Sequence, residues 1–122
     1  MGRRFAFVVL AGLAMASPAA AKMTVGTFVA KANALRANPL TAIASPDLQL
    51  LRAEAQTATR ELKAERDARK GAGKPPIACP PQGQSIGIME MLDGLAALPP
   101  ADRKLPLKQG YAKVIAKRFP CR

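Results

Sequence analysis

The chain has 122 residues and a formal net charge of +11, with 19 Lys and Arg against 8 Asp and Glu. It contains no His, no Trp, one Tyr and four Phe. The missing His removes the commonest general base, which argues against an enzyme, and the few aromatic side chains argue against a base-stacking surface for nucleic acid.

The first residues have the pattern of a cleavable export signal. Two arginines form a charged start, an apolar run follows at 5–14, and small residues lead to Ala21. The run is shorter than the roughly 20 apolar residues of a membrane-spanning helix, so we expect a signal peptide over 1–21, cut between Ala21 and Lys22. A retained membrane anchor is the alternative, and the export route stays open. The prediction is a periplasmic or secreted protein.

Cleavage would leave residues 22–122, a suitable length for one domain with a modest core. Without the two arginines of the signal, the formal net charge falls from +11 to +9. The first predicted helix runs from Thr24 to Ala37, where apolar residues recur at helical spacing and Thr24 is placed to cap the first turn. Asn38-Pro39 ends it, because a residue before proline is disfavoured in a helix. Residues 40–44 are then expected to form a short connecting turn.

The next predicted element is a long helix over 45–70. Ser45-Pro46-Asp47 combines an N-cap, a proline at the first helical position and a carboxylate near the positive end of the helix dipole. Its first half carries an apolar stripe at helical spacing. The stretch from Arg60 to Lys70 is mostly charged, so we expect that half to project into solvent.

The rest of the chain predicts a loop and shorter helices. A loop is expected over 71–84, which holds three glycines and four prolines. Ser85 is expected to cap a third helix that Leu98-Pro99-Pro100 closes, and a single turn at 101–104 and a last helix opened by Pro106 follow. No alternating pattern is long enough for a strand. The predicted fold class is all-α, a domain of four to five helices.

The two cysteines, Cys79 and Cys121, are most simply interpreted as one disulfide. Exported compartments are oxidising, and a domain of this size has little core to spare. In the chain-entropy model such a bridge stabilises the fold by roughly 4 kcal/mol. Two free or intermolecular thiols are the alternative.

Acidic side chains are the remaining source of catalytic chemistry. The candidates are Glu61, Glu65 and Asp67 in the long helix and Glu90 and Asp93 in the third helix. They lie among Lys and Arg or on faces expected to be exposed, so we interpret them as solvated charge. No Cys or His cluster indicates a metal site. We expect no enzyme activity, no metal, no cofactor and no small-molecule substrate.

A basic surface is the candidate binding site. The long helix presents Arg52, and the last helix adds Lys108, Lys113, Lys117 and Arg118. The residues predicted to contact a partner come from the second half of the long helix and the loop behind it: Arg60, Lys63, Arg66, Arg69, Lys70 and Lys74. The functional interpretation is attraction of an acidic partner. The alternative is that these cations form a solvated helix face with no binding role, because positive charge alone does not identify a binding partner.

The second half of the chain resembles the Rap/Tai immunity proteins. The resemblance rests on Cys79-Pro80-Pro81, on a helix ending at Leu98-Pro99-Pro100, and on the terminal Phe119-Pro120-Cys121. It implies a small, exported, helical protein that binds and inhibits a peptidoglycan amidase toxin delivered by a type VI secretion system, often as a homodimer. The family usually carries further cysteines in its early helices, which 22–78 lacks, so its toxin-contacting residues are not carried over.

A second hypothesis takes the basic helix as the functional feature. On this hypothesis the protein is a periplasmic scaffold or envelope-binding module that contacts anionic polymer or lipid. Its binding to anionic liposomes or wall fragments would weaken as salt is added, and binding that is absent or unchanged in high salt would count against it.

Overall fold

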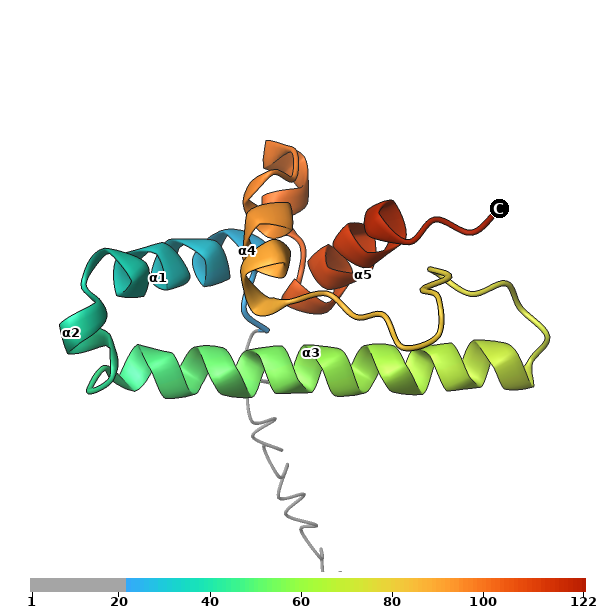
Figure 1. Cartoon of the computed structure of the whole chain (residues 1–122), viewed down its shortest axis with the longest axis horizontal. Helices are drawn as coiled ribbons and strands as arrows, with labels where there is room; N and C mark the ends of the chain where they lie inside the picture. Colours follow the sequence, from blue (N-terminus) through green and yellow to red (C-terminus); the bar gives the residue numbers. More distant parts are fainter. Residues whose placement is uncertain (1–21) are drawn as a thin grey trace, which may run out of the picture.

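The computed structural model describes residues 22–122, so the predicted signal peptide and the cleavage residue Ala21 lie outside the described residues. This part of the chain holds five α-helices, one short 3-10 helix and no strand (Figure 1). The helices are α1 (Val25–Ala37), α2 (Pro39–Ala42), α3 (Pro46–Gly71), α4 (Ile88–Ala96), η1 (Pro100–Lys104) and α5 (Leu107–Arg118). The all-α prediction is confirmed.

Local capping signals explain where the first helices start. The Thr24 hydroxyl accepts a hydrogen bond from the Thr27 amide at 3.2 Å, and the Ser45 hydroxyl accepts one from the Asp47 amide at 3.2 Å. Both side chains satisfy an amide that the first helical turn leaves without a partner. The stretch after Asn38 forms the short α2 instead of a simple turn, with Pro39 at its first position.

The long helix α3 runs along one side of the molecule, and α1 and α5 pack against it (Figure 1). The expectation that its charged half projects alone into solvent is wrong. Leu62 packs against the core, and Glu65 forms an ion pair with Lys108 of α5 at 3.4 Å. The docking of α5 along this half is a tertiary contact that the helix's own sequence does not encode.

The start of α4 differs from the prediction. Ser85 does not cap it: the loop continues to Gly87, and α4 begins at Ile88 with no side-chain cap. Ile86 is partly buried against the core, which keeps this segment extended. Earlier in the loop, the Cys79 amide donates to the carbonyl of Phe119 at 2.8 Å. The loop is therefore held at Cys79 beside the end of α5, and the residues after Cys79 must extend from there to the start of α4 at Ile88.

The core lies where α1, α4 and α5 meet. Val25 and Leu95 are fully buried, and Gly110 of α5 lets both approach its backbone closely. A single antiparallel bridge between Thr24 and Pro106 holds the starts of α1 and α5 together. Separately from the core packing, no helix within 22–122 is long and apolar enough to span a bilayer. The helix α4 packs mainly on α1 and α5 rather than on α3.

A candidate partner-binding groove

The space between α3 and α4 is an open groove of about 1020 Å³. One wall is α3 from Leu48 to Arg66, and the other is α4 with the preceding segment at 77–88. Side chains of α1 and α5 close the bottom. The groove exists because α4 is held against α1 and α5, which leaves the apolar stripe of α3 only partly covered.

The floor of the groove is apolar. Phe28, Leu51, Met91 and Tyr111 are buried core residues that also line it. The rings of Phe28 and Tyr111 meet edge to face, with centroids 6.3 Å apart and planes at 86°. Burial raises the pKa of the Tyr111 phenol above 10.0, so this side chain adds no charge at neutral pH. A groove of about 1020 Å³ with an apolar floor is typical of a binding site.

Five cations surround this floor, and we call them the basic rim: Arg36, Arg52, Arg60, Lys63 and Arg66. All five are exposed, and no described residue that lines the groove is Asp or Glu. Four of them belong to α3, where the 3.6-residue turn places them within about 120° of one another around the helix. From Arg52 to Arg66 they extend over about 21 Å.

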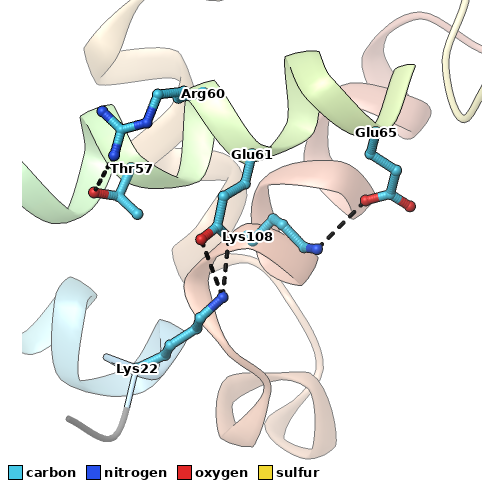
Figure 2. Close-up of polar contacts among 6 residues, drawn as sticks. All are labelled: Lys22, Thr57, Arg60, Glu61, Glu65 and Lys108. Atoms are coloured by element: carbon cyan, nitrogen blue, oxygen red, sulfur yellow. Dashed lines mark hydrogen bonds and ion pairs between the residues drawn. The ribbon is translucent and has the colours of Figure 1, made fainter. Parts of the chain in front are cut away.

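Two carboxylates of α3, Glu61 and Glu65, form ion pairs with lysines that do not line the groove (Figure 2). Both oxygens of Glu61 accept from the Lys22 ammonium at 3.1 Å, and Glu65 pairs with Lys108. Arg60 leaves the helix in another direction, and its guanidinium donates to the Thr57 hydroxyl at 3.4 Å.

Three cations of the basic rim lack an ionic partner within the described part of the chain. Arg36 and Arg66 have carboxylates nearby, at 3.8 Å from Asp93 and 3.3 Å from Asp67. Arg52, Arg60 and Lys63 form no ion pair with any described residue. The rim therefore carries uncompensated positive charge.

The structure divides the predicted basic surface. Arg60, Lys63 and Arg66 line the groove, whereas Lys70 and Lys74 lie outside its lining. Arg69 is also outside, since its guanidinium is engaged by Glu65 at 3.8 Å and by the carbonyl of Pro75 at 3.0 Å.

Sequence reasoning missed Arg36, and it placed Arg52 on the basic surface without counting it among the predicted partner contacts. Arg52 directly follows Leu51 of the apolar stripe, and this adjacency was the available signal. Arg36 comes from another helix, so only the packing of α1 beside α3 joins it to the rim.

The disulfide fixes one wall of the groove. The sulfurs of Cys79 and Cys121 are 1.99 Å apart, so the predicted bridge is confirmed. Both cysteines are exposed, and the neighbours Ala78 and Pro80 line the groove. The bridge therefore ties the loop wall to the end of α5 next to Phe119, which is buried and also lines the groove.

The acidic residues considered for catalysis lie elsewhere. Glu90 pairs with Arg118 at 2.8 Å, and both Glu90 and Asp93 are exposed, as expected. Among residues 22–122, no three His, Cys, Asp or Glu side chains gather into a candidate metal site. The groove offers apolar contact and positive charge.

Comparisons with known proteins give no match: no family model, no curated protein and no solved structure is similar to the chain. The likeness of Cys79 to Arg122 to the Rap/Tai proteins therefore stays an expectation that rests on the residues quoted above.

Proposed function

We propose that this chain is an exported, non-catalytic binding protein that seats an acidic, partly apolar segment of a partner protein in the groove. One observation carries the proposal: five cations line the groove beside an apolar floor, three of them without an ionic partner among the described residues, and no described Asp or Glu lines it. An apolar centre with a charged border is how protein interfaces are commonly built. The charge pattern favours an acidic partner over a basic one.

The nature of the partner follows from the family resemblance. It implies a toxin of the peptidoglycan amidase class, and binding would inhibit the toxin by covering part of its surface. The mature protein would act outside the cytoplasm as an immunity protein. This part of the proposal depends on the export signal and on the Rap/Tai likeness, whereas the groove supports protein binding independently of both.

Site-specific photo-cross-linking in the producing cells tests the proposal. A photoreactive amino acid at Ile88, which is 80% exposed and lines the groove, is compared with the same group at Leu40, which is 93% exposed on α2. We expect one discrete protein adduct from position 88 and none from position 40. Equal labelling from both positions, or no protein adduct at all, would show that the groove is not a protein-binding site.

The identity of the adduct tests the toxin assignment separately. Mass spectrometry of the adduct should identify an exported hydrolase, and the purified chain should reduce the activity of that hydrolase on peptidoglycan. An adduct with a protein of another class would remove the immunity role and leave the binding role in place.

A further inference from the structure

We infer, on the basis of the proposed function, that the occupant of the groove is an amphipathic α-helix of the partner, acidic along its flank and lying lengthwise on α3. This goes beyond protein binding in general, because it names the kind of segment and the residue pattern that the groove selects.

The length of the groove supports a helical occupant. Its α3 wall runs from Leu48 to Arg66, which corresponds to about 27 Å at 1.5 Å per residue. A partner helix of about 18 residues, or five turns, has this length. The two walls are a helix and a helix with its preceding loop, a setting in which an apolar helix face is commonly received. Within 22–122 there is no strand, so strand addition to a sheet edge has no template there.

The distribution of charge distinguishes a helix from a lipid. A fatty acid or a phospholipid concentrates its negative charge in one headgroup, which would require cations at one end of the groove. Here Arg52, Arg60, Lys63 and Arg66 are spread along α3, and Arg36 extends the rim to the end of α1. A helix with several carboxylates along one flank can meet all of these positions, whereas a single headgroup cannot.

The groove also dictates the sequence pattern of the occupant. Apolar residues at i, i+3 or i+4, and i+7 would face Leu51, Met91 and Tyr111 on the floor. Glu or Asp residues on the flank beside α3 would approach Arg60 and Lys63, which have no ionic partner among the described residues. Exposed ion pairs of this kind each contribute little to affinity, so the apolar face provides the larger part of it.

Two synthetic peptides test the inference with the mature chain, disulfide intact. The first, which we call the amphipathic Glu peptide, has about 18 residues, with Leu and Ile on one helical face and Glu along one flank of that face. The second has the same composition in an order that destroys the apolar face. We expect the first to bind at least about tenfold more tightly in fluorescence anisotropy and to gain helical circular dichroism on binding. Equal affinities, or binding without added helicity, would overturn the inference.

A lipid control and the cellular cross-link complete the test. Dodecanoate should compete weakly with the first peptide; if it competes at lower concentrations than the unlabelled peptide, the groove is a lipid site and the inference fails. The position-88 adduct should map to a helical segment of the partner. A protein adduct that maps to a loop would overturn the helix while the binding proposal stands, and absence of any protein adduct would defeat the binding proposal itself.

Discussion

At the scale of single residues, Gly110 is a position where the core has no room for an added side-chain carbon. A Cβ placed on it would overlap Cγ2 of Val25 and lie 3.0 Å from Cδ2 of Leu95, and both of those side chains are 0% exposed. Neither neighbour has free space to move into. The close contact of α1, α4 and α5 therefore depends on a missing side chain.

We expect Gly110→Ala to lower the free energy of unfolding by about 2 kcal/mol, because overpacking outweighs the better helix propensity of Ala. Urea denaturation followed by circular dichroism measures the change. Gly71→Ala is the matched control, since a Cβ there meets nothing within 4 Å, and its effect should stay within about 0.5 kcal/mol. Similar losses for both variants would contradict the packing explanation.

Tyr111 gives a direct test of burial at the groove floor. Burial raises the pKa of its phenol above the ordinary 10.0. As pH rises past about 10, the unfolded chain releases this proton while the folded chain retains it, so stability falls with pH in that range. Because the chain has one Tyr, phenolate absorbance reports Tyr111 alone.

We expect the absorbance titration of the native protein to have its midpoint above 10.0 and to return to about 10 in denaturant. In Tyr111→Phe, the alkaline loss of stability should be smaller than in the unchanged protein. A native midpoint at or below the denatured one would show that Tyr111 is solvated and does not form an apolar floor.

At the scale of elements, the disulfide holds the loop wall of the groove. Few other contacts attach this loop to the helices, among them the Cys79 amide bond to Phe119 and the Arg69 bond to Pro75. Both cysteines are exposed and neither belongs to the hydrophobic core cluster, so we expect the bridge to shape the groove more than the core.

Replacing both cysteines, Cys79→Ser with Cys121→Ser, should lower the free energy of unfolding by up to about 4 kcal/mol and weaken binding of the amphipathic Glu peptide. Peptide anisotropy, run where circular dichroism shows the variant still folded, separates the two effects. Unchanged affinity in a folded variant would show that the loop is not a functional wall.

The elements also show what local sequence can predict. Thr24, Ser45-Pro46 and Pro106 start their helices as expected, because capping depends on neighbouring residues. The start of α4 was predicted wrongly at Ser85, because burial of Ile86 and the tether of the loop act over long sequence distances. Capping rules cannot include such contacts.

The candidate site was predicted only in part, for a related reason. The apolar stripe in the first half of α3 is a pattern that predicts packing against the rest of the domain. Part of it lines an open groove instead, because α4 docks mainly on α1 and α5. Half of the predicted contact cations, from Arg60 to Arg66, border the groove. Helix periodicity places Arg52 on the same side of α3, but the sequence does not show that this side borders a groove.

At the scale of the whole molecule, the positive charge should steer the partner while the apolar floor holds it. Raising salt from about 0.1 M to about 1 M shortens the screening length from about 10 Å to about 3 Å. We expect the association rate of the amphipathic Glu peptide to fall several-fold and its dissociation rate to change little. Complete loss of binding at high salt, measured by stopped-flow fluorescence, would favour the anionic envelope-binding hypothesis instead.

The central claim is that the groove, and not the net charge, recognises the partner. Two triple variants remove the same charge: Arg60→Gln, Lys63→Gln and Arg66→Gln on the basic rim, and Lys70→Gln, Lys74→Gln and Lys117→Gln outside it. The most direct measurement is the affinity of both variants for the amphipathic Glu peptide. The rim variant should bind about tenfold more weakly and the outer variant nearly as tightly as the unchanged chain; equal weakening of the two would contradict the claim.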